Sequence, residues 1–148
     1  DYYAAAQRMD MSLDQIMTIA SMIQAESANV SEFENVSSVF YNRLSHPDAF
    51  PYLESDATVR YAVGNRTDPI TAEQLQTVNP YNTYVTKGLP PGPICNPGLD
   101  AIRYALYPAS TNYYFFVADN DGNTIFSETR EQHEAAVAQV RAQAQAQT

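Results

Sequence analysis

Four expected helices in this chain begin with the pattern of a helix capping box, in which a Ser or Thr is followed three residues later by Gln or Glu. The two polar side chains of such a box satisfy backbone N–H groups that have no partner within the first helical turn. Each box therefore predicts the start of a helix, and together they predict a mostly helical chain. The boxes are Ser12–Gln15, Ser31–Glu34, Thr71–Gln74 and Thr129–Gln132.

Apolar side chains at helical spacing follow the first two boxes. The first box predicts a helix over residues 13–28. The second predicts a helix that ends at His46–Pro47, because the residue before a proline avoids the helical region. The apolar positions of these helices are Leu13, Ile16, Met17, Ala20 and Ile23, followed by Val36, Val39, Phe40 and Leu44. Both stripes are expected to form the core.

Weaker signals define the rest of the chain. Asn96 and Pro97 predict an N-cap and a first-turn proline for a helix over residues 98–106, whereas residues 53–63 fit either a short strand or a helical turn. The other expected elements are a lead-in at 1–11, a short helix from Thr71, a strand at 112–118, a returning strand at 124–127, a helix over 129–141 and a frayed tail at 142–148. This order predicts one α+β domain over residues 1–148, mostly helical, with a small β-hairpin.

Residues 79–98 are too rich in Pro, Gly and Asn to form a regular element. An irregular segment of this length inside a compact domain is usually functional. Its aromatic, amide and hydroxyl side chains suit a groove for a polar, uncharged ligand. They belong to Tyr81, Asn82, Thr83 and Tyr84. A rigid packed loop, whose prolines lower the entropy of the unfolded chain, is the alternative interpretation.

Glu26 is the residue that most clearly indicates chemistry. On a helical wheel it lies beside Met22 and Ile23, at the border of the apolar stripe and near the expected end of the helix. Partial burial and the negative end of the helix dipole both disfavour the ionised carboxyl, so we expect a raised pKa. A raised pKa suits a general acid that works near neutral pH. A solvated glutamate at the border of the stripe is the alternative.

A second carboxylate would complete the pair that most glycosidases use, one as acid and one as base or nucleophile. The segment LESDATVRY supplies two candidates, Asp56 and Glu54. Asp56 could equally cap a turn together with Ser55 and Thr58, as is common for aspartate. Both interpretations of Asp56 stay open from the residues alone.

The net charge of −9, from 17 acidic and 8 basic residues, argues against a nucleic-acid partner, because binding to phosphates requires a basic face. It also argues against electrostatic attachment to a membrane surface. The single cysteine, Cys95, excludes an internal disulfide and is expected to pack as a small side chain. His46 and His133 lack the spacing of metal ligands, so neither a metal nor another cofactor is expected.

Six stretches of the chain, in order, resemble the endolytic murein transglycosylases of the YceG-like (MltG) family. They span nearly all of residues 13–133, and the fourth is the most specific. The stretches are IASMIQAES, VSSVFYNRL, LESDATVRYAVG, NPYNTYVTKGLPPGPICNPG, ALYPASTNYYFFV and FSETREQHE. The resemblance implies a catalytic domain with a lysozyme-like helical core, and the family's membrane helix and LysM-like segment are not among these residues.

The resemblance also implies an activity. Such enzymes cleave the bond from N-acetylmuramic acid to N-acetylglucosamine inside murein strands and leave a 1,6-anhydro end. One glutamate performs both proton transfers, and by the resemblance this residue is Glu26. A muramidase-type hydrolase that uses Glu26 and Asp56 is an alternative, and so is a glycan-binding module without catalytic activity.

By the same resemblance, ten further side chains would bind the glycan strand. They are Ser27, Asn42, Arg43, Ser55, Asp56, Thr58, Tyr81, Asn82, Thr83 and Tyr84. Two positions depart from the family's pattern. Thr124 stands where the family often has a His, so no catalytic role is assigned there, and Ala57 stands where the family usually has a Pro.

The resemblance implies partners and a location as well. The expected partner is the peptidoglycan strand, at the extracytoplasmic face of the bacterial cell membrane, and the full-length protein is expected to be membrane-anchored and associated with cell-wall synthesis proteins. Because peptidoglycan carries lactyl and peptide carboxylates, an acidic chain cannot attract it by bulk charge. We therefore expect a neutral or locally basic groove, with Arg43 or Lys87 as local cations.

Overall fold

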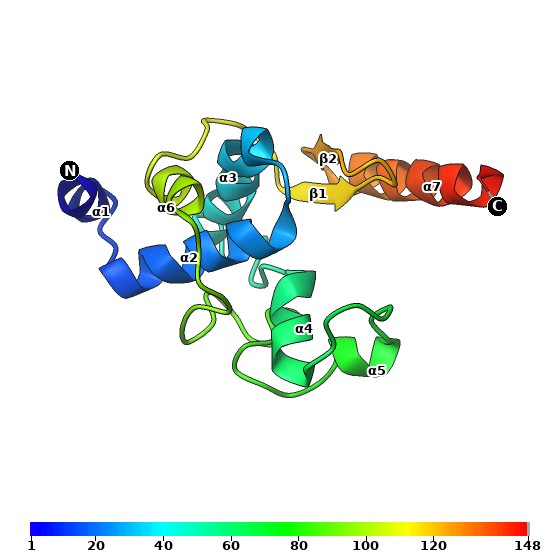
Figure 1. The fold of residues 1–148 in the computed structure, drawn as a ribbon, viewed down its shortest axis with the longest axis horizontal. Coiled ribbons are helices and arrows are strands. Elements are labelled where there is room, and N and C mark those ends of the chain that lie inside the picture. The colour runs from blue at the N-terminus through cyan, green and yellow to red at the C-terminus, as the bar shows by residue number, and fades with distance from the viewer. Residues whose placement is uncertain (148) are drawn as a thin grey trace.

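The structure, a computed structural model, describes residues 1–147 and is mostly helical with one two-stranded sheet. Helices α1, α2, α3 and α6 gather on one side in Figure 1, α4 and α5 lie below them, and the sheet with α7 extends to the other side. The elements are α1 (Tyr2–Arg8), α2 (Leu13–Glu26), the 3-10 turn η1 (Val30–Glu32), α3 (Phe33–Leu44), α4 (Asp56–Val63), α5 (Ala72–Leu75), α6 (Leu99–Leu106), β1 (Phe115–Ala118), β2 (Thr124–Ser127) and α7 (Arg130–Ala146). This content confirms the predicted α+β class.

Helix α2 lies at the centre of the helical part, packed against α3 and α6. Its capping box forms as predicted: the Ser12 hydroxyl accepts from the Gln15 N–H at 3.1 Å, and the Gln15 side chain accepts from the Ser12 N–H at 2.9 Å. The apolar stripe that follows faces the core, where Ile19, Ile23 and Phe40 have no exposed surface. The buried face of α2 therefore fixes the position of its last residue, the candidate acid.

The second expected box, at Ser31–Glu34, is wrong. Ser31 lies within η1, where its N–H donates to the Asn29 side chain at 3.1 Å. Helix α3 then begins at Phe33 without a side-chain cap. The physical reason is competition, because Asn29 is itself a strong capping residue and starts the turn two residues earlier than the box would.

The segment 79–98 contains no helix or strand, as predicted from its composition. It leads into α6, but Asn96 does not cap that helix as expected. Gly98 occupies the N-cap position, and its N–H donates to the Gln24 side chain of α2 at 3.0 Å. A contact between two helices that are distant in sequence thus replaces the local cap.

Residues 53–63, for which the sequence left strand and helical turn open, contain α4. This helix ends at Gly64, whose φ of +72° is a left-handed conformation that glycine adopts readily. The box at Thr71 forms as predicted and starts α5, with the Thr71 hydroxyl accepting from the Gln74 N–H at 3.1 Å. These two short helices make up the lower part of Figure 1.

Strands β1 and β2 pair in antiparallel fashion, with Phe115 opposite Ser127, which confirms the predicted hairpin. Strand β1 is shorter than the predicted strand at 112–118. The Asn42 side chain donates to two backbone carbonyls within residues 111–113, at 3.0 and 2.8 Å. These carbonyls are therefore bound to helix α3 rather than to a neighbouring strand.

Both ends of the chain are more helical than predicted. The lead-in contains α1, in which Ala5 and Ala6 are buried. Helix α7 begins at the predicted Thr129 box and packs on β1 and β2, but it continues to Ala146 through most of the expected frayed tail. Alanine and glutamine favour helix there, and Thr148 lies outside the described residues. No helix within residues 1–147 is long and apolar enough to cross a membrane.

Candidate active site

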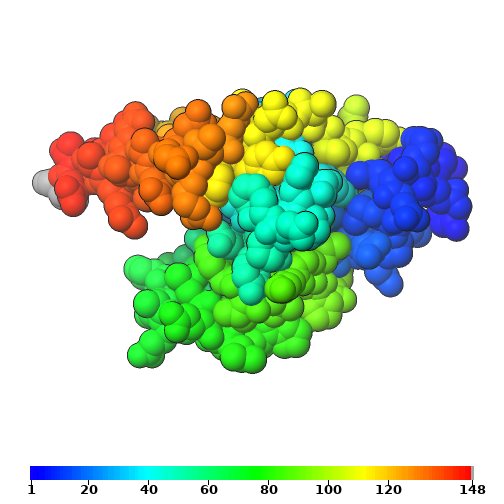
Figure 2. Space-filling model, turned by 180° about the vertical axis from the view of Figure 1, so that it is seen from behind, coloured from blue at the N-terminus to red at the C-terminus, as the bar shows by residue number. Residues whose placement is uncertain are grey.

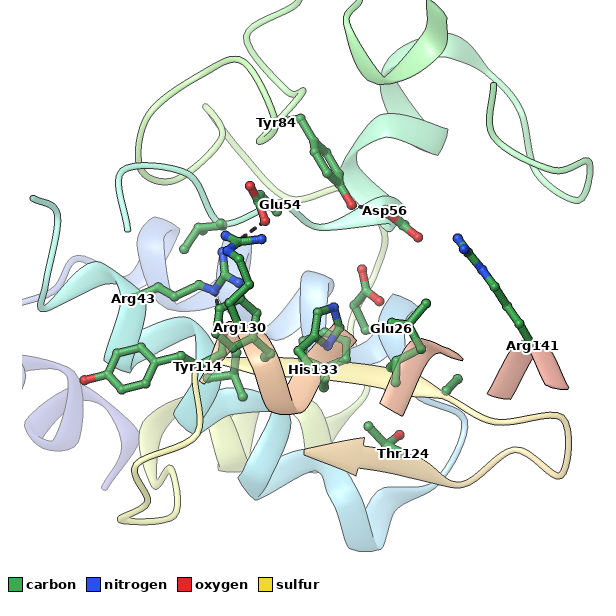
Figure 3. A pocket seen from close by; sticks show the side chains of 17 residues that line it. Glu26, Arg43, Glu54, Asp56, Tyr84, Tyr114, Thr124, Arg130, His133 and Arg141 are labelled. Carbon is green, nitrogen blue, oxygen red and sulfur yellow. Dashed lines mark hydrogen bonds and ion pairs between the residues drawn. The ribbon is translucent and has the colours of Figure 1, made fainter. Parts of the chain in front are cut away.

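A cavity of about 430 Å³ is bordered by the end of α2, the start of α4, strand β1 and one face of α7. Figure 2 shows the surface hollowed where α7 and the segment that includes α4 face each other. Five of the predicted site residues line the cavity, namely Glu26, Arg43, Glu54, Asp56 and Tyr84 (Figure 3). Tertiary packing therefore brings together side chains from four separate parts of the sequence.

Glu26 is the last residue of α2, and its carboxyl group is held on one side only. Its Oε1 accepts a hydrogen bond of 2.6 Å from the Ser55 hydroxyl and one of 3.1 Å from the Ala57 N–H. Its Oε2 has no hydrogen-bond partner among the described residues, and Figure 3 shows the group pointing into the cavity. Burial raises the pKa of Glu26 and outweighs the two hydrogen bonds, which lower it. The direction agrees with the prediction, and it keeps a proton available on the free oxygen.

Three of the predicted glycan contacts, Ser55, Thr58 and Thr83, form a buried cluster in which the two threonines hold Ser55 in place. The Ser55 N–H donates to the Thr83 hydroxyl at 2.8 Å, and the Thr58 hydroxyl donates to the Ser55 carbonyl at 2.7 Å. The hydroxyls of Thr58 and Thr83 also lie within 2.8 Å of each other. These side chains do not line the cavity. They fix the backbone from which Ser55 reaches Glu26.

Asp56 is the first residue of α4 and does not cap it, because Ser55 occupies the N-cap position. The alternative interpretation of Asp56 as a turn cap is therefore not realised. Its Oδ1 accepts a hydrogen bond of 2.5 Å from the Tyr84 hydroxyl. Burial, and then the Asp56 charge, raise the pKa of Tyr84, so the phenol stays protonated and donates. Asp56 thus presents a carboxylate to the same cavity as Glu26.

Arg43 is a buried cation on α3 with 5% exposure. Its Nε donates to the Tyr114 carbonyl at 2.7 Å, its Nη1 donates to the Tyr52 carbonyl at 2.9 Å, and Nη1 lies 3.6 Å from the Glu54 carboxylate. Glu54 has a φ of +53°, a left-handed conformation that is costly for a residue other than glycine. It leads directly into Ser55. Arg43 therefore anchors the backbone segment that carries the partner of the candidate acid.

Four other predicted glycan contacts lie outside the cavity lining: Ser27, Asn42, Tyr81 and Asn82. Asn82 is completely buried, and its amide donates to the carbonyls of Leu75 at 3.0 Å and Thr77 at 2.9 Å. The amide of Asn42 is likewise occupied by the backbone of residues 111–113. In this structure both asparagines fasten loops to helices.

Ser27 and Tyr81 also contact protein. The Ser27 hydroxyl donates to the Glu32 carboxylate at 3.1 Å, and the same carboxylate accepts from the Thr124 N–H at 2.8 Å, which ties the end of α2 to β2. The Tyr81 ring lies against Tyr61 of α4, with centroids 4.8 Å apart. These side chains support the walls of the cavity, and a direct contact with a glycan stays a prediction for each.

Helix α7 supplies a wall that was not predicted. Arg130, His133 and Arg141 line the cavity, whereas Lys87, one of the two expected local cations, is exposed outside it. His133 stacks on Phe115 with ring centroids 5.1 Å apart, and burial and the neighbouring arginines lower its pKa. The helical spacing of the three residues was visible in the sequence. Only the packing of α7 on the sheet turns that face toward the cavity.

Cys95, the remaining candidate for chemistry in the sequence, lies outside the cavity lining. Cys95 is exposed rather than packed as expected, and its thiol donates to the Ser21 carbonyl at 3.3 Å. Partial burial raises the pKa of the Cys95 thiol, which disfavours the nucleophilic thiolate. In the part of the chain that the structure describes, no three His, Cys, Asp or Glu side chains are grouped so that they could hold a metal ion.

Comparison with known proteins gives consistent matches. The YceG-like family matches residues 1–139. The endolytic murein transglycosylase of Bacillus subtilis (strain 168) is 36% identical over 135 residues, 91% of this chain and 37% of that protein. The enzyme of the same name from Streptococcus pneumoniae serotype 2 is 31% identical over 144 residues, 93% of this chain and 26% of that protein. A crystal structure of a YceG-like protein from Listeria monocytogenes matches with a TM-score of 0.84 and 37% identity, covering 91% of this chain and 43% of that one. The chain thus spans less than half the length of these relatives.

Proposed function

This chain belongs to the YceG-like family, and we propose that it is the catalytic domain of a lytic transglycosylase that cleaves murein strands internally. The name of the two curated relatives, endolytic murein transglycosylase, supports this activity. The observation that carries the proposal is the Glu26 carboxyl group, with one oxygen held by Ser55 and Ala57 and the other free toward the cavity. A group of this kind is suited to give up a proton and take one back.

The proposed reaction uses Glu26 twice. Protonated Glu26 gives its proton to the oxygen that links N-acetylmuramic acid to N-acetylglucosamine, and the bond from C1 to that oxygen breaks. The carboxylate then accepts the proton of the muramyl 6-hydroxyl as that oxygen attacks C1, which closes the 1,6-anhydro ring and restores the acid. The Ser55 and Ala57 hydrogen bonds stabilise the carboxylate between the two steps. No water is consumed.

A hydrolase that uses Glu26 and Asp56 is the second candidate. The observation in its favour is that Asp56 lines the same cavity and carries a carboxylate able to activate water. The two reactions differ in their products. Hydrolysis adds a water to the new end, whereas transglycosylation leaves an anhydro end of lower mass.

Mass spectrometry of the products from purified glycan strands tests the proposal. We expect anhydro ends with the wild-type protein and none with Glu26→Gln, which keeps the shape of the side chain. Glu73→Gln, at an exposed position on α5, is the matched control and should retain full activity. Products that carry the added water would favour the hydrolase. If the wild-type protein and its variants bind the strand but none of them cleaves it, the result would favour a glycan-binding module.

The substrate also suggests a location. Murein lies outside the cytoplasmic membrane, so we place the activity at the extracytoplasmic face of the bacterial cell membrane. Membrane anchoring of the full-length protein and its association with cell-wall synthesis proteins, both implied by the resemblance, stay predictions. Protease accessibility of the tagged full-length protein in intact spheroplasts would test the location.

A further inference from the structure

Three side chains of α7, those of Arg130, His133 and Arg141, form one face along the cavity, here called the α7 cationic face after its two arginines. Their spacing of three and eight residues places them on the same side of the helix. The two arginines are separated by about 16 Å along the axis, since a helix rises about 1.5 Å per residue. Figure 3 shows all three projecting from α7 toward the side of the cavity that holds Glu26 and Asp56.

Among the described residues, the two arginines of this face form no ion pair. Within residues 1–147 the ion pair is that of Arg43 with Glu54, and neither Arg130 nor Arg141 has a carboxylate partner or a hydrogen-bond acceptor there. The guanidinium of Arg130 lies 5.2 Å from the centroid of the Phe115 ring, a contact that leaves its N–H groups unoccupied. Both arginines are exposed. Their donors are therefore available to a ligand.

The position of these cations is unusual for so acidic a chain. The protein has 8 basic residues against 17 acidic ones, yet three of its arginines, Arg43, Arg130 and Arg141, line this one cavity. The guanidinium of Arg43 already contacts two backbone carbonyls and Glu54. The arginines of the cavity whose donors are free are therefore the two on α7. A neutral sugar needs no such charge. An anionic group on the substrate does, and a guanidinium matches a carboxylate in shape as well as charge.

We propose that the α7 cationic face is a subsite for the carboxylates that murein strands carry on the muramyl lactyl substituent or, where a peptide stem is amide-bonded to that substituent, on the stem. This inference rests on the proposed function and adds a specificity to it: strands with free carboxylates should be preferred over the same strands with neutral substituents. The two arginines supply the donors of this subsite, because the His133 Nδ1 between them is buried.

The test uses a double variant that carries both Arg130→Gln and Arg141→Gln. It is compared with the wild-type protein on two substrates. One is a glycan strand that retains its stems with free carboxylates, and the other is the same strand after carbodiimide coupling to ammonia, which converts the carboxylates to amides. We expect the double variant to raise KM about tenfold on the first substrate, the effect of losing charge-assisted hydrogen bonds. The kcat should be unchanged, and KM on the amidated strand should be the same for both proteins.

A matched control is the double variant Arg8→Gln/Arg66→Gln, which removes the same number of charges from exposed positions outside the cavity. It should leave KM unchanged on both substrates. The single charge reversal Arg141→Glu, at an exposed position late in α7, serves if the double variant does not fold and should also raise KM on the first substrate. In strands stripped of their stems, cleavage of the amide bond frees the lactyl carboxylate, and these strands show whether the face accepts that carboxylate by whether they behave like the first or the second substrate.

Two outcomes of this comparison overturn the inference. If the double variant raises KM equally on both substrates, the face supports the wall without recognising carboxylates. If KM changes on neither, the face is not a subsite, while Glu26-dependent cleavage would still stand. If wild type cleaves no strand, the proposed function fails, and calorimetric titration of both strands into wild type and the double variant decides the carboxylate preference separately.

Discussion

The Ser55 hydroxyl donates a hydrogen bond of 2.6 Å to Oε1 of Glu26, across 29 residues of sequence. Ser55 is itself fixed by the buried hydroxyls of Thr58 and Thr83. The Glu26 carboxyl group is therefore oriented by the start of α4 as well as by α2, the helix that carries it. Because the hydrogen bond favours the carboxylate while burial favours the neutral acid, the two effects oppose each other in setting the pKa of Glu26.

Replacing Ser55 by Ala should change both the rate and its pH dependence. The substitution removes a hydrogen bond to the carboxylate, so the pKa of Glu26 should rise further. Since Glu26 must be protonated to act as the acid, the alkaline limb of the kcat/KM profile should move to higher pH. The loss of positioning should lower kcat by about tenfold.

The control for this experiment is Ser37→Ala. Ser37 is also buried, but its hydroxyl has no hydrogen-bond partner among the described residues. This variant should leave the pH profile in place. An unchanged profile for Ser55→Ala as well would show that Ser55 does not tune the acid.

Replacing Glu26 by Gln should stabilise the fold at neutral pH while it removes activity. Between the ordinary pKa of 4.5 and the raised folded value, the native state binds more protons than the unfolded state, so stability falls as pH rises. Gln cannot ionise and still accepts from Ser55 and Ala57, so it should gain roughly 1 kcal/mol. Urea unfolding at several pH values measures this, and the gain should vanish below the ordinary pKa. A variant less stable than wild type at pH 7 would contradict the account.

The left-handed backbone at Glu54 predicts an order of stability for two variants. Both Glu54→Ala and Glu54→Gly lose the contact with Arg43, but only glycine adopts a φ of +53° without strain. The glycine variant should therefore be more stable than the alanine variant by about 1 kcal/mol. Thermal unfolding under one buffer condition compares them, and equal melting temperatures would argue against strain at this residue.

Replacing Asn82 by Ala tests whether this residue stabilises the fold or binds the glycan. Its buried amide satisfies the carbonyls of residues 75 and 77, and its oxygen accepts from the Tyr84 N–H at 2.9 Å. Asn82→Ala leaves these groups unpaired and should lower the free energy of unfolding by roughly 2–3 kcal/mol. Asn120→Ala, in the exposed turn of the hairpin, should have no such effect. If Asn82→Ala instead raises KM without any loss of stability, Asn82 contacts the glycan as first predicted.

Local patterns predicted the helices well where the cap and the apolar stripe agreed. The boxes at Ser12, Thr71 and Thr129 all form, because their donors and acceptors lie within one turn of each other. The predictions failed where another acceptor competed for the same N–H. Asn29 started η1 ahead of Ser31, and Gln24 of a different helix satisfied the N–H of Gly98.

The site was predictable to a similar degree. The sequence placed Glu26 at the border of an apolar stripe, which is a property of one helix, and gave the direction of its pKa. It also pointed to Asp56 and Tyr84, which meet in the cavity. It could not tell that Asn42 and Asn82 turn toward backbone carbonyls instead, because side-chain amides bind glycans and carbonyls through the same groups.

The sequence by itself determined the α+β class, the helix that carries Glu26 and the acidic charge that argues against a nucleic-acid partner, because these depend on composition and on contacts within a few residues. Only the tertiary structure decided which oxygen of Glu26 is free and which face of α7 meets the cavity. Both depend on packing between segments far apart in the chain, such as Glu26 with Ser55 and α7 with the hairpin. The same packing places Arg130 and Arg141, whose donors are free, in the cavity that holds the candidate acid. The net charge of the chain gives no sign of this local positive charge.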